Sequence, residues 1–244
     1  MGDHFEEQLR EEMSSMNIAL TDRQVHQFRE YFRLLTEWNQ VMNLTAITEE
    51  SDVITKHFTD SVSLVRAIPS IYNKETGFRI ADVGTGAGFP GIPISIINPG
   101  LRVVLMDSLN KRIRFLEETA RTLELDHVTA VHGRAEEFGR NRDCREQFDI
   151  CVSRAVANMS TLSEYCLPLV KQGGKFIAYK SEKAEEEMKS AEGAIKKLGG
   201  MTEDILSFQL PNGDERKLVI IGKKKPTPKQ YPRKAGTPAK EPLT

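Results

Sequence analysis

The stretch Ile80-Ala-Asp-Val-Gly-Thr-Gly-Ala-Gly-Phe-Pro-Gly91 joins a short apolar run to a glycine-rich loop. The run predicts a buried strand, and Pro90 suits the start of a helix, where a missing N–H costs little. Gly86, Gly88 and Gly91 also satisfy G-x-G-x-x-G, the pattern with which dinucleotide-binding folds hold a pyrophosphate. The segment therefore predicts a strand, loop and helix whose backbone approaches a ligand closely.

Asp82 decides between two classes of ligand. A carboxylate two residues before the first glycine lies where a pyrophosphate would approach, and burying like charges together is costly. S-adenosylmethionine instead carries an ammonium group and a positive sulfonium, and it has no phosphate. The D-x-G-x-G-x-G pattern of Asp82, Gly84, Gly86 and Gly88 therefore predicts this cofactor. The alternative for Asp82 is a cap on the loop or helix.

Two further acidic positions follow at the ends of later apolar runs. Asp107 comes 25 residues after Asp82 and is placed to accept the two ribose hydroxyls of the cofactor. Ala135 and Glu136 would bracket the adenine. Open α/β sheets bind ligands at the carboxyl ends of their strands, so these pieces reinforce the glycine loop. The alternatives are a turn residue for Asp107 and, for Glu136, an acid favoured by the helix dipole.

The remainder of the central region alternates apolar runs with helical patterns, which predicts a parallel sheet. Two later runs, 205–210 and 217–221, are separated by a short turn sequence and predict an antiparallel hairpin. The expected fold is α/β, a Rossmann-like seven-stranded sheet ending in that hairpin. The other expected strands are 78–83, 103–106, 128–131, 148–152 and 175–179, and the expected helices are 89–97, 110–123, 158–169 and 182–198.

Residues 1–70 carry no strand signal and predict a small helical cap on the α/β domain, which we place at residues 71–222. The main helix is expected to begin at Thr21, with Gln24 completing a capping box. Residues 3–16 and 59–68 predict two more helices.

Residues 223–244 form a basic tail with a net charge of +6, against −7 for the rest of the chain. The tail holds five of the eleven prolines and few bulky apolar side chains, so we expect it to be disordered. A flexible cationic arm suits a phosphate backbone, and a solubilising tail is an equal alternative.

Composition excludes several other classes of protein. At 244 residues the chain can bury a core without disulfides or a structural metal. It has no apolar run long enough for a membrane span, and its acidic start lacks the features of a signal peptide, so we expect a cytoplasmic protein. Three cysteines without a C-x-x-C pair predict no metal site.

The residues after the fourth expected strand indicate the methyl acceptor. The run Phe148-Asp-Ile-Cys-Val-Ser-Arg-Ala-Val156 lacks both the Asn-Pro-Pro-Tyr type of motif for exocyclic amines and a Pro-Cys nucleophile. Arg154 remains as a permanent cation that cannot act as a base. An acceptor methylated without a base must already own a lone pair, as guanine N7 does, and it needs mainly to be held in line. The alternative for Arg154 is an ion pair with a neighbouring carboxylate such as Asp149.

Four stretches resemble one family, the bacterial 16S ribosomal RNA guanine-N7 methyltransferases, first known as glucose-inhibited division protein B. The resemblance covers roughly residues 15–222 and is carried by Trp38-Asn-Gln-Val-Met-Asn-Leu-Thr45, His57-Phe-Thr-Asp-Ser61, Asp82-Val-Gly-Thr-Gly-Ala-Gly-Phe-Pro-Gly-Ile-Pro93 and Ser153-Arg-Ala-Val-Ala157. It implies a class I S-adenosylmethionine-dependent methyltransferase acting on one guanine near the decoding centre of the small ribosomal subunit. It also implies cofactor contacts at Gly84, Phe89, Ala135 and Glu136, with Arg154 at the site.

The upstream motifs add candidate substrate contacts. Asn39 and Asn43 share a helical face, and His57 precedes an aromatic residue, so these side chains could read and stack on a base. Lys180 ends the fifth expected strand, where it could meet phosphate. The alternatives are structural roles at the junction of cap and sheet, and a solvated surface for Lys180. For the protein as a whole, the alternatives are a small-molecule methyltransferase of this fold and a non-catalytic nucleotide-binding regulator.

Overall fold

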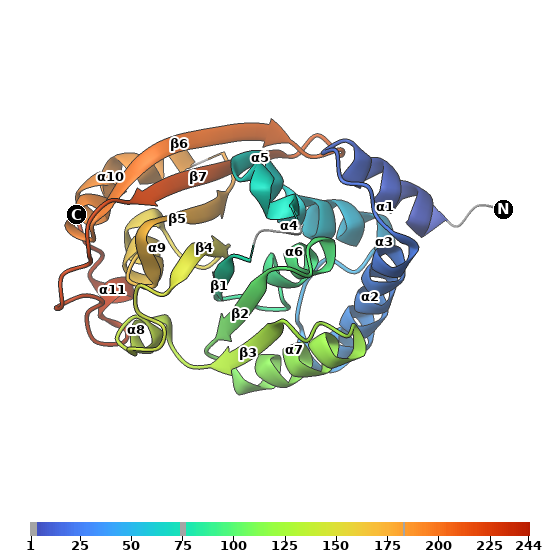
Figure 1. Cartoon of the computed structure of the whole chain (residues 1–244), viewed down its shortest axis with the longest axis horizontal. Helices are drawn as coiled ribbons and strands as arrows, with labels where there is room; N and C mark the ends of the chain where they lie inside the picture. The colour runs from blue at the N-terminus through green and yellow to red at the C-terminus, as the bar shows by residue number, and fades with distance from the viewer. Residues whose placement is uncertain (1–3, 74–76, 183) are drawn as a thin grey trace.

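One mixed sheet runs through the molecule. The computed structural model describes residues 4–73, 77–182 and 184–244. Its seven strands follow the order β3-β2-β1-β4-β5-β7-β6, with β1 to β5 parallel and β7 antiparallel to both β5 and β6 (Figure 1). This confirms the Rossmann-like sheet with a C-terminal hairpin. The strands are β1 (Arg79–Val83), β2 (Arg102–Asp107), β3 (Val128–His132), β4 (Phe148–Arg154), β5 (Val170–Lys180), β6 (Gly200–Gln209) and β7 (Glu215–Lys223).

Helices cover both faces of the sheet, because alternate strand residues point to opposite sides. Ile80 and Ile150 belong to a core shared with α6 (Gly91–Ile97), α7 (Asn110–Thr122) and the N-terminal helices. Their neighbours Ala81 and Cys151 belong to a second core under α9 (Met159–Cys166) and α10 (Ala184–Lys197), on the other side in Figure 1. Two short helices, α8 (Ala135–Phe138) and α11 (Thr237–Lys240), lie on the side of α9.

The N-terminal helices share the first core with the sheet. Phe28 and Tyr31 of α2 (Asp22–Met42) are buried in the same cluster as Ile80. The capping box of Thr21 and Gln24 is present as predicted. Of the predicted helix 3–16, α1 spans His4–Ser14, and Asp3 lies outside the described residues. No helix in the described ranges is long and apolar enough to cross a membrane.

The third predicted helix, 59–68, begins earlier than expected. Helical structure starts at α3 (Glu50–Val53) and continues through a π-helical turn (Ile54–Thr59) into α4 (Asp60–Val62) and α5 (Leu64–Ala67), followed by a 3₁₀ turn (Pro69–Tyr72). π-Helical turns within helices frequently occur at functional sites. This one contains His57 and directly precedes Asp60, and both residues face the end of β4 as described below.

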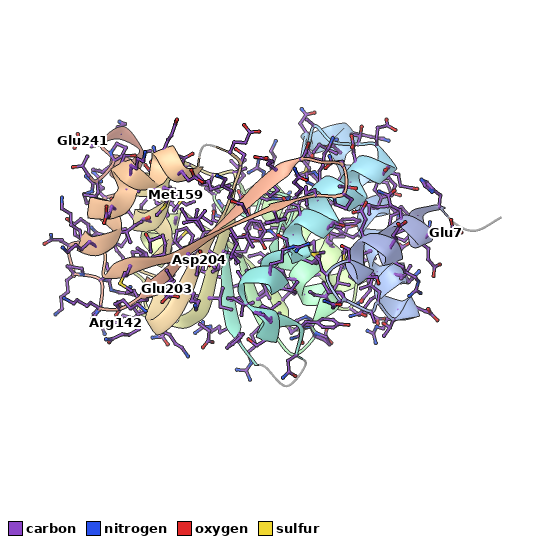
Figure 2. All side chains as sticks on the ribbon, turned by 90° about the horizontal axis from the view of Figure 1, so that it is seen from above. Glu7, Arg142, Met159, Glu203, Asp204 and Glu241 are labelled. Carbon is purple, nitrogen blue, oxygen red and sulfur yellow. The ribbon has the colours of Figure 1, made fainter. Side chains whose placement is uncertain are left out.

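The expectation that residues 223–244 are disordered is wrong. Lys223 completes β7, and its ammonium donates to the carbonyl oxygen of Leu167 at 2.5 Å in a fully buried position. Arg233 pairs with Glu164, whose side chain is 0% exposed. The segment therefore packs along the body of the protein. Figure 2 shows Glu241 at the end of the molecule opposite Glu7.

The prediction of disorder rested on the side chains of the segment, which are mostly polar or proline. Many of the bonds that fix the segment are instead made by its backbone carbonyl oxygens. Arg145 donates to the carbonyl oxygens of Thr227 and Tyr231, both at 2.7 Å, and Arg140 donates to that of Pro232 at 2.8 Å. Prolines also restrict the unfolded chain, so ordering them costs less conformational entropy than ordering other residues. Cations of the body and carbonyls of the segment thus replace the apolar contacts that the composition lacks.

We predict that Arg233→Ala lowers the free energy of unfolding by about 3 kcal/mol, because it leaves the buried Glu164 carboxylate without its cation. Urea unfolding measures the change. Arg23→Ala is the matched control: its ion pair with Glu124 is exposed (66% and 74%), and its loss should cost less than about 1 kcal/mol. Equal effects of the two substitutions would contradict a packed C-terminal segment.

Candidate active site

Asp82, at the end of β1, fixes the loop between β1 and α6 by hydrogen bonds. Oδ2 of this fully buried carboxylate accepts a hydrogen bond from the Gly91 N–H at 2.8 Å and one from the Thr85 hydroxyl at 2.7 Å. Burial raises the pKa of Asp82 to about 6. Asp82 thus makes the loop-cap contacts of its alternative interpretation. Its Oδ1 has no hydrogen-bond partner within the described ranges, but the side chain is fully buried and does not line either of the two cavities described below.

Three glycines of the loop adopt conformations that side chains disfavour. Gly84, Gly86 and Gly88 have φ values of +70°, +61° and +100°. A Cβ atom on Gly84 would also lie 2.5 Å from Cγ2 of Val156. One on Gly86 would meet no described atom within 4 Å, so this glycine faces open space. The loop is therefore shaped both to pack under Val156 and to leave room above its centre.

A cavity of about 310 Å³ lies beside this loop, at the carboxyl ends of the central strands. Four of the predicted cofactor residues line it, namely Gly84, Asp107, Ala135 and Glu136. The remaining lining residues are Val83, Met106, Ser108, Gly133, Arg134, Phe138, Val156, Ala157, Tyr165 and Ala239. Its volume is within the range of small-ligand sites. We call it the first cavity.

Asp107 connects the first cavity to the glycine loop. Its Oδ2 accepts from the Gly86 N–H at 3.0 Å and pairs with Arg112 at 3.2 Å, and its Oδ1 accepts from the Leu109 N–H at 2.9 Å. The charged residues lining the cavity are Asp107, Glu136 and a single cation, Arg134. Such a lining suits a ligand with a positive centre and repels a diphosphate.

A second cavity of about 430 Å³ lies on the other side of residues 154–157. Ala155 lines this second cavity, whereas Val156 and Ala157 line the first, so the segment after β4 separates the two. Of the predicted site residues, His57, Arg154 and Lys180 line it. The other lining residues are Ile47, Lys56, Asp60, Tyr179, Ser181, Glu187, Phe208, Arg216, Lys217 and Leu218.

Arg154 forms the ion pair of its alternative interpretation, but with Asp60 of the cap and not with Asp149. Asp149 instead accepts from the Arg79 N–H and pairs with Lys171, so the suggested Arg154–Asp149 ion pair is wrong. Arg154 donates to Asp60 Oδ2 at 2.7 Å, and its guanidinium lies 5.0 Å from the centre of the Phe89 ring. The pair is possible because the π-helical turn brings Asp60 to the end of β4.

His57 is held as a neutral hydrogen-bond acceptor toward Arg154. Its Nδ1 lies 3.2 Å both from the Arg154 guanidinium, which can only donate, and from the Lys56 carbonyl oxygen, which can only accept. We assign the ring proton to Nε2, 2.8 Å from the Thr45 hydroxyl, because the guanidinium carries the stronger, charged donor. Burial and the Arg154 cation lower the pKa of His57 to about 3. The ring stacks on Phe89 with centroids 4.4 Å apart. His57 therefore positions its neighbours and is a poor proton acceptor.

The other predicted contacts fall in different places. Asn39 exchanges hydrogen bonds with the backbone of Thr45, both at 2.9 Å, and so supports the partner of His57. Asn43 ends α2 in a left-handed conformation. Neither asparagine is among the lining residues of the two cavities described above, and Phe89 packs against His57 rather than facing the first cavity. Lys180 donates to the Ala157 carbonyl oxygen at 2.7 Å and pairs with Glu187 at 2.8 Å.

Several residues of the site escaped sequence reasoning. Asp60 stands inside the H-F-x-D-S motif, and its buried carboxylate faces both Arg154 and, at 3.5 Å, Arg216 of the hairpin. The H-F-x-D-S motif could have indicated Asp60 as a site residue. No sequence motif around Arg216 indicates a role at the site, because only the antiparallel pairing of β7 brings it to the cavity. Ala239 lies in the segment that was expected to be disordered.

We predict that His57→Asn makes the free energy of unfolding depend less steeply on pH below about pH 6.5. Because the folded state holds His57 neutral with a pKa of about 3, only the unfolded state binds a proton between about pH 6.5 and 3. Wild-type stability should therefore fall on acidification more steeply than that of the variant, by up to about 1.4 kcal/mol per pH unit. Urea unfolding at each pH measures this. Above about pH 7.5 the two profiles should run parallel, and parallel profiles throughout would contradict the neutral histidine.

Known proteins resemble this chain over nearly its whole length. A protein from Lachnoclostridium phytofermentans named ribosomal RNA small subunit methyltransferase G is 54% identical over 232 residues, which is 95% of this chain and 94% of that protein. A protein of the same name from Staphylococcus aureus strain Newman is 52% identical over 239 residues, 97% of this chain and 98% of that one.

Among solved structures, TrmN from Thermus thermophilus has a TM-score of 0.51 at 16% identity, covering 70% of this chain and 53% of that chain. This likeness concerns the fold alone, which is that of class I methyltransferases. The family described as GidB, rRNA small subunit methyltransferase G, matches residues 24–219. The chain belongs to this family of ribosomal RNA methyltransferases.

Proposed function

We propose that this protein transfers the methyl group of S-adenosylmethionine to N7 of one guanine in 16S ribosomal RNA, in the decoding-centre loop of the small subunit. It would work in the cytoplasm, on the RNA or on the small subunit. The family supports ribosomal RNA as the acceptor class. The choice of atom is supported by the second cavity.

The first cavity fits S-adenosylmethionine. Asp107 and Glu136 line it against the single cation Arg134, Gly86 leaves open space above the neighbouring loop, and the buried Asp82 fixes the shape of that loop through Gly91 and Thr85. Asp82 and the glycine loop would hold the amino-acid end, Asp107 the ribose, and Ala135 with Glu136 the adenine. The bound cofactor supplies an electrophilic methyl group on a positively charged sulfur.

The observation that carries the choice of N7 is that every acid lining the second cavity is already paired. Asp60 faces Arg154 and Arg216, and Glu187 pairs with Lys180. His57 has a pKa of about 3 and accepts from Arg154. Asp60 Oδ1 accepts no hydrogen bond within the described ranges, but both acids lie against cations, so the cavity favours an acceptor that needs no base. Guanine N7 needs none, because it carries a lone pair and no proton.

The charge of the second cavity suits RNA. Five cations line it, Lys56, Arg154, Lys180, Arg216 and Lys217, against two acids. Cations that neutralise phosphates dominate the affinity of proteins for nucleic acids. The chain as a whole carries a formal net charge of −1, and around this cavity Lys56 and Lys217 are also paired, with Asp52 and Glu185.

Positioning is then the main contribution of this chain to the reaction. Arg154 lies at the boundary between the cavities, fixed by Asp60, by His57 and by the Lys56 carbonyl oxygen at 3.1 Å. A fixed donor at this place can hydrogen-bond an acceptor such as guanine O6, beside N7. Holding the reacting atoms in line supplies much of the rate enhancement in such reactions.

The proposal is tested by mapping methyl groups on the RNA. Small subunits from cells that lack this protein are incubated with the purified enzyme and S-adenosylmethionine. We expect one new N7-methylguanine in the decoding-centre loop of 16S RNA, detected by mass mapping and by borohydride–aniline cleavage. A methyl group on another atom or another base would overturn the assignment.

We predict that Arg154→Lys lowers kcat about 10- to 100-fold while the Kd for S-adenosylmethionine stays within about twofold. A lysine keeps the charge but cannot reach Asp60, His57 and the acceptor together. Single-turnover methylation and calorimetry measure the two quantities.

Arg79→Lys is the control, because Arg79 packs over Phe148 and lines neither of the two cavities. It should leave kcat unchanged. Wild-type turnover in Arg154→Lys would remove this arginine from the mechanism.

A further inference from the structure

The C-terminal segment, residues 224–244, reaches the first cavity. Ala239 of α11 is one of its lining residues. The Gly236 N–H, at the start of the same helix, donates to Glu136 Oε1 at 2.8 Å. Glu136 also lines the cavity and is only 5% exposed. A segment outside the matched family region therefore contacts the cavity wall both directly and through an acid.

The segment is anchored on both sides of these contacts. Before them, Arg233 binds Glu164 through its side chain and through its backbone N–H at 2.7 Å. Within α11, the carbonyl oxygen of the buried Pro238 accepts from the Thr161 hydroxyl at 3.0 Å. Glu164 and Thr161 both belong to α9, whose Tyr165 lines the same cavity. The helix beside the cavity thus sets the position of the segment.

The position of Glu136 indicates which end of a ligand the segment meets. Asp82 and the glycine loop lie at the end of β1, Asp107 ends β2, and Glu136 follows β3 at the edge of the sheet. A ligand with its ammonium at Asp82 and its ribose at Asp107 places its adenine beside Glu136. An exocyclic amine donates to a carboxylate, and a carboxylate oxygen accepts more than one hydrogen bond. The Gly236 N–H can therefore orient the Glu136 carboxylate, which can still accept a hydrogen bond from the adenine amine.

The backbone at this contact requires a glycine. Gly236 has φ of +85°, a conformation that other residues rarely adopt. It directs its N–H to Glu136 while Thr237 begins the short helix that carries Ala239. The local sequence Ala-Gly-Thr-Pro-Ala thus combines a turn, a helix start and a small residue at the cavity.

We propose that the C-terminal segment forms a wall of the cofactor site, and that Gly236 and Ala239 set the affinity for the adenosine half of S-adenosylmethionine. The proposal rests on the place assigned to the cofactor in the proposed function. In this proposal the segment acts at the cofactor site through the Gly236 backbone N–H and the small Ala239 side chain, and not through its basic side chains.

The decisive variant is Ala239→Trp, which fills part of the first cavity from an exposed helix. We expect its Kd for S-adenosylhomocysteine to rise at least about tenfold, with the midpoint of thermal unfolding and the KM for small subunits unchanged. Ala235→Trp is the matched control, since Ala235 is exposed in the same segment and is not a lining residue. It should bind like the wild type.

A second measurement locates the effect on the ligand. Removing residues 234–244 keeps Arg233 on Glu164 but deletes Gly236 and Ala239. Affinities for S-adenosylhomocysteine and for 5′-methylthioadenosine, which lacks the amino-acid end, should fall by the same factor. If this truncated chain does not fold, Ala239→Trp decides alone.

The outcomes separate the two proposals. Wild-type affinity in Ala239→Trp, or in a folded truncated chain, would overturn the role of the segment and leave the cofactor assignment intact. Failure of the wild-type protein itself to bind S-adenosylhomocysteine would overturn the cofactor assignment, and the role of the segment with it.

Discussion

The bond between Arg154 and Asp60 joins three parts of the chain at one point. Arg154 ends β4, Asp60 follows the π-helical turn of the cap, and Arg216 approaches from the hairpin at 3.5 Å. The Asp60 side chain is only 4% exposed, so removing either partner would leave a costly buried charge. His57 and the Lys56 carbonyl oxygen also bind this guanidinium, so Arg154 connects three other residues that line the second cavity.

Three acids that the sequence indicates as cofactor contacts share a second role. Asp82 accepts from the Gly91 N–H, Asp107 from the Gly86 N–H and Glu136 from the Gly236 N–H. The structural and functional interpretations of these acids are therefore compatible. Gly91 has no room for a side chain beside Asp82, whereas Gly86 and Gly236 have the positive φ values that favour glycine. A carboxylate can accept more than one hydrogen bond, so each acid retains capacity for a further donor.

Local patterns allowed the sheet and the glycine loop to be predicted from the sequence, because strand periodicity, turn residues and caps act between near neighbours. Long-range pairing was not accessible in the same way. Asp149 was the nearest acid in sequence to Arg154, yet Arg154 binds Asp60, 94 residues away. The C-terminal segment was misjudged for a related reason: its stabilising hydrogen bonds join its own carbonyl oxygens to Arg140 and Arg145 of the body. Neither composition nor periodicity records such partners.

The two cavities differ in charge, and the segment after β4 keeps them apart. Acids prevail in the first and cations in the second, which suits a positively charged methyl donor on one side and an anionic polymer on the other. Val156 stands at the boundary, packed where a side chain on Gly84 would have to lie. The glycine loop, the strand end and the cap each contribute to the boundary between the two cavities. The cap also shares its core with the sheet, so the same packing that holds the cap on the sheet fixes the position of His57 and Asp60 relative to β4.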